Sequence, residues 1–258
     1  MQLSQQAIVA QGVGVEYDLR LSRQRTLRAT ISDVMRRRRR SKGSRFWALR
    51  DVTFAARAGE TFGIVGRNGS GKSTLLLTIG GILRPDTGVI RTSGRTSALL
   101  ALGAGFEPDL TGRENIYLNA ALLGMSRREI DDRVGDIISF SELGDFIDVP
   151  LRKYSSGMRV RLGFSIASTI EPDILLLDEV LGVGDASFRV KSQERLEDLA
   201  AKAKAIVLVS HNLNFVKEMC ERVLWLNEGR VAAYGDARAV VDEYEEMTKR
   251  YRGPVRAV

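Results

Sequence analysis

The sequence predicts an α/β domain built around a mixed, mostly parallel β-sheet. Three short apolar runs, at 61–65, 173–179 and 205–211, have the length and composition of buried parallel strands. Residues 112–170 are mainly helical in pattern, with apolar side chains at the spacing of one helix face. Strands that alternate with helices along a chain favour a parallel sheet covered by helices.

The other predicted elements follow in chain order. Residues 7–17 carry the β-branched residues of a first strand, and residues 46–60 combine a strand with a Gly turn. A capping box at 126–129 marks the start of a helix. Residues 222–235 predict two strands around an Asn-Glu-Gly turn, and the polar segment at about 236–252 predicts a final helix.

Composition favours a cytosolic protein. The chain has 258 residues, 44% hydrophobic and 28% charged, which is ordinary for a globular domain with one substantial core. Cys220 is the single cysteine, so no internal disulfide forms and nothing requires an oxidising compartment. We see neither a signal peptide nor an apolar run of membrane-spanning length, so work at a membrane would need a partner.

The positive charge is concentrated in one segment. Residues 18–45 carry a net charge of +9, including five consecutive arginines at 36–40, whereas the whole chain carries +7. The remainder is therefore nearly neutral, at −2. Nucleic-acid-binding domains usually spread basic residues over the folded surface that docks, so this distribution weakens that interpretation. Within the segment, the apolar spacing at 27–35 predicts a helix.

The segment from Gly66 to Ser73 has the sequence GRNGSGKS and directly follows the strand predicted at 61–65. Every fixed position of the phosphate-binding pattern G-x-x-x-x-G-K-[ST] is present, between a strand and a helix as the pattern requires. The glycines let N–H groups point at phosphate oxygens, Lys72 reaches the β- and γ-phosphates, and Ser73 ligates Mg²⁺. The predicted ATP contacts here are Gly66, Arg67, Asn68, Gly69, Ser70, Gly71, Lys72, Ser73 and Thr74.

Two carboxylates, Asp178 and Glu179, end the strand predicted at 173–179. Sheets of α/β proteins place ligands at the carboxyl ends of their strands. Alone, the pair would be equally well explained as solvated acids. Beside a phosphate loop, we expect Asp178 to hold Mg²⁺ and Glu179 to act as general base for the attacking water.

Residues 154–158, with the sequence YSSGM, open an apolar helix. Ser155 or Ser156 would suit a plain helix N-cap, and the same geometry suits an anion site. The position of the segment, about twenty residues before the acidic strand, favours the anion site.

GRNGSGKS, YSSGM, LLLDE and Ser210-His211, in this order and spacing, resemble the ATP-binding subunits of ABC transporters. The resemblance implies that YSSGM is the signature sequence and that Ser155, Ser156, Gly157 and the D-loop Asp185 contact the ATP of a second copy. It also implies that His211, the only histidine, is the switch histidine with a catalytic role. The glutamine expected near 102–107 is absent, and Glu107 or a neighbour occupies that region.

Longer segments narrow the resemblance to the polysaccharide-export branch, whose members move O-antigen, capsule or teichoic acid chains. They are FWALRDVTF, LGAGFEPDLTGRENIYLNA, YSSGMRVRLGFSIA and DEVLGVGDASF, together with the arginine-rich insertion at 18–45. The implied fold is one ABC-type nucleotide-binding domain over 1–258, a P-loop NTPase with an antiparallel β subdomain. Its RecA-like core spans about 1–105 and 169–235, and a helical arm spans about 106–168.

An aromatic ring is expected to stack on adenine, a contact that contributes about 1–3 kcal/mol per base. The family places that ring at the end of the first strand, which is Tyr17 here, with Phe46 and Trp47 as alternatives. Each ring would also suit the protein core.

The expected protein is the ATP-hydrolysing subunit of a transporter that exports a lipid-linked polysaccharide. The resemblance implies a homodimer, a separate transmembrane permease docked on the arm, and a peripheral place on the cytoplasmic face of the inner membrane. We expect residues 18–45 to contact the membrane surface, because arginine binds phosphate in a bidentate manner; the alternative is a solvated loop. The rival functions are a soluble ABC ATPase acting on nucleic acid or ribosomes, and an exporter subunit for a different substrate.

Overall fold

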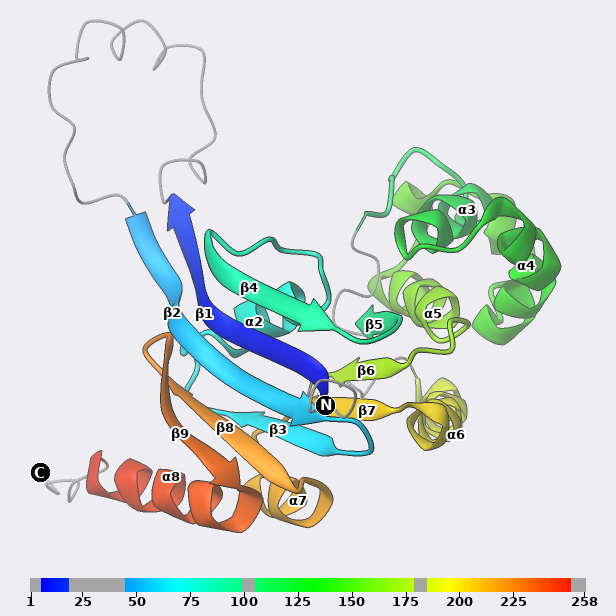
Figure 1. Ribbon diagram of the computed structural model, residues 1–258. Coiled ribbons are helices and arrows are strands. Elements are labelled where there is room, and N and C mark those ends of the chain that lie inside the picture. The colour runs from blue at the N-terminus through cyan, green and yellow to red at the C-terminus, as the bar shows by residue number, and fades with distance from the viewer. Residues whose placement is uncertain (1–5, 19–44, 99–104, 179–184, 252–258) are drawn as a thin grey trace, which may run out of the picture.

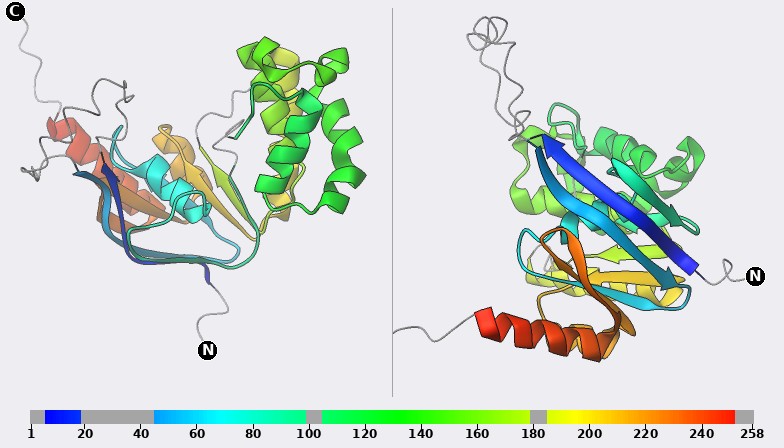
Figure 2. Two further views of the ribbon diagram at one scale, coloured as in Figure 1. Left: turned by 90° about the horizontal axis from the view of Figure 1, so that it is seen from above. Right: turned by 60° about the vertical axis from the view of Figure 1, so that its left-hand side comes forward.

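A computed structural model describes residues 6–18, 45–98, 105–178 and 185–251 of the chain (Figure 1). Two β-sheets lie at the centre, and a group of helices projects from one side of them (Figure 1). Figure 2 gives two further views of these layers.

The smaller sheet is antiparallel and has the strand order β2-β1-β4. Its strands are β1 (Gln6–Asp18), β2 (Arg45–Arg57) and β4 (Thr87–Thr92). Ile8 and Ala10 of β1 are fully buried, and after a register shift in the strand Val13 and Val15 occupy the same core. The strand predicted at 7–17 and the antiparallel β subdomain are thus confirmed.

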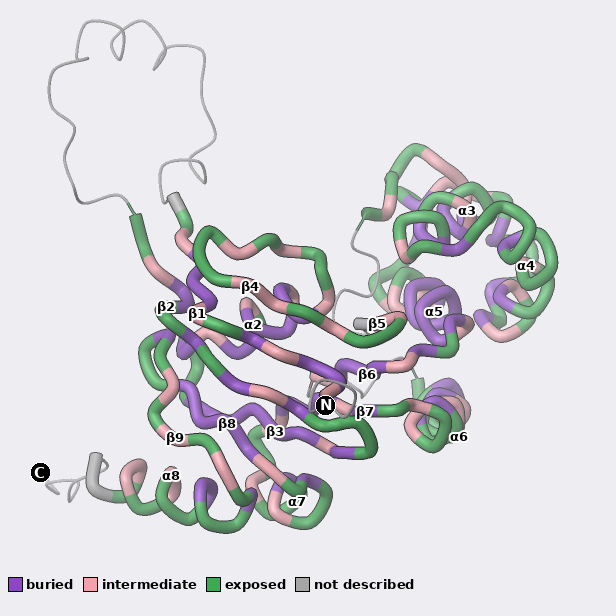
Figure 3. The backbone as a smooth tube through the Cα atoms, in the orientation of Figure 1, coloured by how far each residue is buried: buried purple, intermediate pink, exposed green. Residues whose placement is uncertain are grey.

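The larger sheet has the strand order β5-β6-β7-β3-β8-β9, and every neighbouring pair is parallel except β8 and β9. Its strands are β3 (Thr61–Val65), β5 (Thr96–Ala98), β6 (Ile174–Leu177), β7 (Ala205–Val209), β8 (Arg222–Asn227) and β9 (Arg230–Asp236). The three strands predicted from apolar runs are β6, β7 and β3, neighbours in the middle of the sheet. They are mostly buried (Figure 3), as central parallel strands must be. The mixed, mostly parallel sheet is therefore confirmed.

The turn between β8 and β9 contains two consecutive residues with left-handed backbone, Glu228 at φ 48° and Gly229 at φ 76°. Two positive φ angles give the hairpin turn whose twist matches that of the flanking strands. The Asn-Glu-Gly turn predicted within 222–235 is confirmed.

The main core joins the two sheets to helix α2 (Lys72–Ile79). Leu49 of β2, Ile64 of β3 and Leu75 of α2 are all fully buried in it. Burying each such side chain stabilises the fold by about 1.5–3 kcal/mol. This packing fixes the start of α2 relative to the end of β3, and the phosphate loop connects these two points.

The helical arm is a layer with a core of its own. Its helices are α3 (Gly112–Leu122), α4 (Arg127–Ser141) and α5 (Ser156–Ala167), with short 3-10 turns at Gly144–Asp148 and Leu151–Lys153. Capping boxes start α3 at Thr111 with Glu114, and α4 at Ser126 with Glu129. Apolar side chains from all three helices form one cluster. The mainly helical character predicted for 112–170 is confirmed.

Three further helices cover the larger sheet. They are α6 (Ala186–Lys202), α7 (Leu213–Met219) and α8 (Ala237–Tyr251). Helix α6 shares a buried cluster with α5 and β6, while α7 and α8 pack on β8. Helix α8 corresponds to the helix predicted at about 236–252, and the helix predicted at 27–35 lies outside the described residues. None of the helices in the described ranges has the length and apolar character needed to cross a bilayer.

Candidate nucleotide-binding site

The phosphate loop between β3 and α2 is shaped by glycine backbone. Gly66, Gly69 and Gly71 have φ angles of 149°, 79° and 104°. A Cβ atom on Gly66 would lie 2.3 Å from the carbonyl oxygen of Leu226, and one on Gly71 would lie 2.6 Å from that of Ala48. Only glycine fits at these two positions, because the neighbouring atoms belong to backbone.

Lys72, in the first turn of α2, contacts this loop through its side chain. Its side chain is largely buried, and Nζ donates to the carbonyl oxygens of Gly66 at 2.8 Å and Arg67 at 3.0 Å. Gly71 is the N-cap of α2 and has no side chain with which to cap it. The N–H groups at the start of α2 are therefore the donors that a phosphate group would meet, with the positive end of the helix dipole behind them.

The β8–β9 turn supports the phosphate loop through a backbone hydrogen bond. The N–H of Gly229 donates to the carbonyl oxygen of Ser70 at 3.1 Å, and the N–H of Arg50 donates to that of Gly229 at 2.7 Å. Within the described residues, the buried Ser70 Oγ has no hydrogen-bond partner. Sequence reasoning identified the turn at 228–229 but not this support, because its only sequence signal is the turn itself.

One cavity of about 640 Å³ brings the predicted residues together from distant segments. Asp178 follows β6 directly, and His211 lies two residues beyond the end of β7. Because parallel strands end at the same edge of a sheet, both side chains reach the phosphate loop. The residues that line the cavity are Tyr17, Phe46, Ala48, Asn68, Gly69, Gly71, Lys72, Ser73, Thr74, Asp178 and His211.

Two of the three aromatic candidates for the adenine contact lie at this cavity. Tyr17 and Phe46 are register partners in the β1–β2 pair, are 40% and 51% exposed, and both line the cavity. Trp47 instead lines a neighbouring cavity beside Arg50, and its ring packs so close to Gly14 that a Cβ there would lie 2.8 Å from it. An adenine stacked on Tyr17 or Phe46 stays a prediction, and the geometry is less suited to Trp47.

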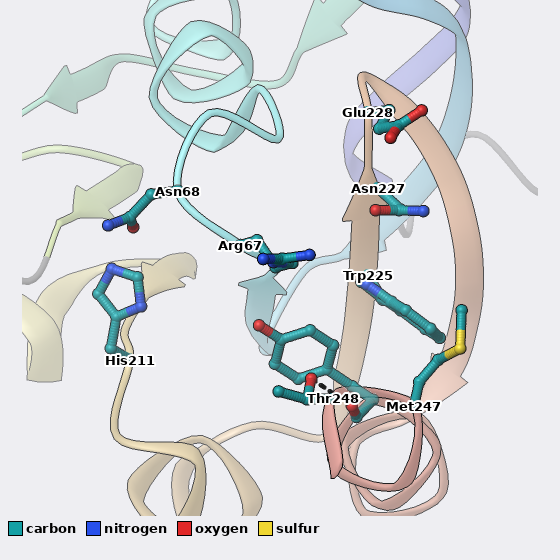
Figure 4. A pocket seen from close by; sticks show the side chains of 9 residues that line it. Arg67, Asn68, His211, Trp225, Asn227, Glu228, Met247 and Thr248 are labelled. Carbon is teal, nitrogen blue, oxygen red and sulfur yellow. Dashed lines mark hydrogen bonds between the residues drawn. The ribbon is translucent and has the colours of Figure 1, made fainter. Parts of the chain in front are cut away.

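A second cavity, of about 570 Å³, lies on the other side of the loop, between it and α8 (Figure 4). Arg67 faces into it, opposite Trp225 of β8. Tyr244 of α8 is among the residues that line it. Asn68 and His211 border both cavities. Arg67 is thus placed beside the second cavity rather than among the residues lining the first.

The residues expected to contact a second copy's ATP do not line the phosphate cavity of their own chain. Ser155 is the N-cap of α5 and accepts a hydrogen bond from the N–H of Met158 at 3.2 Å. Ser156 and Gly157 form the first turn of the same helix. Asp185 is the N-cap of α6. The capping role considered for Ser155 is present, and the anion site at the same helix start stays a prediction.

Two expected features fall partly or wholly outside the described residues. Glu179 lies outside them, directly after Asp178. Of the region 102–107, residues 105–107 are described, and Glu107 is exposed. The backbone of Glu107 is held by the buried Asn115, which accepts from its N–H at 2.8 Å and donates to its carbonyl oxygen at 3.0 Å.

The sheets, the phosphate loop and the helical arm define the class of this protein, which is an ATP-binding P-loop ATPase domain. A family model described as "ABC transporter" matches residues 49–182. The chain therefore belongs to the ABC transporter family.

Named relatives extend the similarity over most of the chain. The O-antigen export system ATP-binding protein RfbB of Klebsiella pneumoniae is 47% identical over 205 residues, covering 80% of this chain and 83% of that protein. The teichoic acids export ATP-binding protein TagH of Levilactobacillus brevis is 43% identical over 246 residues, covering 95% of this chain and 66% of that protein. A solved dimer of the ATP-binding cassette MJ0796, with ADP and Pi, matches at a TM-score of 0.62 and 22% identity, covering 90% of this chain and 99% of that one. At that identity the solved structure confirms the fold.

Proposed function

We propose that this chain is the ATP-hydrolysing subunit of a transporter that exports a lipid-linked polysaccharide across the cytoplasmic membrane. The observation that carries the proposal is the single cavity in which Lys72, Asp178 and His211 meet from three separate segments. The similarity to RfbB, whose name states O-antigen export, supports the polysaccharide class. TagH, named for teichoic acid export, supports the same class.

In this proposal ATP binds with its phosphates against the loop from Gly66 to Thr74. The backbone N–H groups of the loop and of the α2 start donate to phosphate oxygens. The ammonium group of Lys72, which contacts two loop carbonyl oxygens, turns to the β- and γ-phosphates. Adenine stacks on Tyr17 or Phe46, which line the same cavity.

The donor set beside Lys72 suits Mg²⁺. The hydroxyl of Ser73 and the carboxylate of Asp178 both line the cavity, and hard oxygen donors are the ligands that this ion prefers. When bound, Mg²⁺ would neutralise charge on the phosphates. Glu179, the residue after Asp178, would accept a proton from the attacking water, and His211 is the second catalytic side chain that we propose.

We further propose that two copies of the chain enclose two ATP molecules. Ser155, Ser156, Gly157 and Asp185 would complete the partner's site, because they do not line their own. A mixture of Lys72→Ala and Gly157→Asp copies should then regain hydrolysis through one intact composite site, while each variant alone is inactive. Normal hydrolysis by Gly157→Asp alone would exclude the trans arrangement.

The permease and the membrane are the remaining partners that we propose. The helical arm is the docking surface for a transmembrane permease that carries the glycan, and residues 18–45 meet the membrane surface at the cytoplasmic face. Each basic residue near an anionic leaflet contributes about 1 kcal/mol. Changing Arg36 to Arg40 to glutamine should reduce salt-sensitive binding to anionic liposomes while ATP binding survives. Unchanged liposome binding would exclude this contact, and loss of RNA or DNA binding would support the rival function.

The test of the proposed function is complementation of export in cells. Loss of the gene should remove the surface glycan, the wild-type gene should restore it, and Lys72→Ala should not. Purified wild-type protein should hydrolyse ATP, and Lys72→Ala should lose ATP affinity. Glycan export that continues without the gene would refute the export role and leave the ATPase class untouched.

A further inference from the structure

Arg161 makes an unusual set of contacts outside the ATP cavity. Its side chain projects from α5, is 17% exposed and donates to groups from two other segments. Nε donates to the carbonyl oxygen of Ser141 at 2.9 Å, and Nη2 to Glu142 Oε2 at 2.7 Å, both at the end of α4. Nη1 donates to Asp185 Oδ2 at 3.2 Å, at the start of α6. One guanidinium group therefore joins α4, α5 and α6.

Contacts other than the one with Asp185 also hold the guanidinium group of Arg161 in place. Its Cζ lies 5.0 Å from the ring centroid of Phe188, which is fully buried in α6. Glu142, its main acceptor, is itself held by Lys191, whose Nζ lies 2.9 Å from Oε1. This Lys191 contact, more than Arg161, holds the pKa of Glu142 below its usual range, so Glu142 stays charged at neutral pH. Little further entropy is lost when the fixed group meets Asp185.

The two carboxylate oxygens of Asp185 have different hydrogen-bond partners. Oδ1 caps α6, accepting from the N–H of Phe188 at 3.0 Å and from the hydroxyl of Ser187 at 2.9 Å. Oδ2 accepts from Arg161. The cap hydrogen bond from Phe188 is the main reason that the pKa of Asp185 lies below its usual range. The direction of the Asp185 side chain is thus set by its own helix and by α5 together.

We propose that Arg161 is a positioning residue that holds the starts of α5 and α6 in one fixed relation. These two starts carry Ser155, Gly157 and Asp185, the groups that face the partner's nucleotide in the proposed dimer, and the inference rests on that proposed function. Because Arg161 fixes these groups relative to one another, they contact the partner's nucleotide as one surface. Arg161 therefore acts on turnover and on the ATP-bound dimer, and it leaves ATP binding by a single subunit unchanged, because it does not line the phosphate cavity.

If the Arg161–Asp185 pair acted only through stability, any loss of kcat would be accompanied by a loss of stability. The Asp185 side chain is 59% exposed, and ion pairs with an exposed partner contribute little to stability. Asp185→Asn, which breaks this pair and leaves the other contacts of Arg161 in place, should leave the unfolding midpoint nearly unchanged. A loss of kcat without a loss of stability thus separates positioning from folding.

The experiment is a double-substitution cycle with Arg161→Gln and Asp185→Asn. Asparagine keeps an oxygen that caps α6 and turns an N–H₂ group toward Arg161, so it breaks the pair and spares the helix. The control is Arg195→Gln, since Arg195 of α6 also donates to the α5 end, at the carbonyl oxygen of Ser168, and does not touch Asp185. Readouts are kcat, KM, ATP affinity of the monomer, and ATP-dependent dimerisation in the Glu179→Gln background.

We expect each single variant to lower kcat by about fivefold or more, with unchanged monomer affinity, and the double variant to be no worse than the more severe single one. ATP-dependent dimerisation should weaken in parallel, and Arg195→Gln should match wild type. Wild-type kcat in Asp185→Asn, an equal loss in Arg195→Gln, or multiplied losses in the double variant would overturn the proposal. If Arg161→Gln does not fold, Asp185→Asn and Arg161→Lys decide it in the same assays. Absence of ATPase activity in the wild type would instead count against the proposed function. ATP-dependent dimerisation would still test the positioning role of Arg161.

Discussion

Replacing Gly66 with alanine should deform the phosphate loop and abolish tight ATP binding. The new Cβ would stand 2.3 Å from the Leu226 carbonyl oxygen and 2.6 Å from Ser70 Oγ, at a backbone φ of 149°. Leu226 is fully buried in β8, so the loop must move instead. The unusual backbone conformation costs about 1–3 kcal/mol, and overpacking costs a similar amount, about 1–3 kcal/mol. Moving the loop relieves part of this strain and displaces the N–H groups meant for phosphate.

The effect on affinity follows from the hydrogen bonds that are displaced. A hydrogen bond to a charged group contributes about 1.5–3 kcal/mol, so each lost phosphate contact weakens binding by roughly 10- to 150-fold. The assay is titration of a fluorescent ATP analogue, with urea unfolding of the same sample to measure stability.

Gly81→Ala is the matched control. Gly81 also has a positive φ, of 71°, but a Cβ there would meet no atom within 4 Å. It does not line the phosphate cavity. Its replacement should cost about 1–2 kcal/mol of stability and leave ATP affinity unchanged. Near-wild-type affinity in Gly66→Ala, or equal loss in Gly81→Ala, would refute the steric argument.

Three further predictions use other parts of the chain. Glu179→Gln should stop turnover but retain ATP and trap the two-ATP dimer, visible as a doubled mass, because the amide cannot accept the water's proton; near-normal hydrolysis would refute its role. Burial raises the pKa of the Cys220 thiol to about 12, so the thiol stays protonated at pH 8. Its alkylation there should be on the order of 1,000-fold slower than in the urea-unfolded chain, and equal rates would contradict the burial. Glu60→Gln should lower the unfolding free energy in urea by about 3 kcal/mol, since it breaks a largely buried pair with Arg222; a change under about 1 kcal/mol would show that the pair is dispensable.

Features that depend on neighbouring residues could be predicted from the sequence. The spacing of glycines with Lys72 and Ser73 identified the phosphate loop, since the loop is built from consecutive backbone N–H groups. Apolar runs identified β3, β6 and β7, because parallel strands covered on both faces are apolar throughout. The capping box at Ser126 and the turn at Glu228 and Gly229 were equally local signals, and the structure confirmed both.

Which distant residues contact one another became known only from the tertiary structure. The sequence left Tyr17, Phe46 and Trp47 open, and the β1–β2 register places the first two at the cavity and turns the third toward Gly14. The support of Ser70 by Gly229 and the joining of three helices by Arg161 had no signal in the sequence. A hydrogen bond between residues far apart in the chain depends on how sheets and helices pack, and an arginine looks the same in the sequence whether it faces water or three partners.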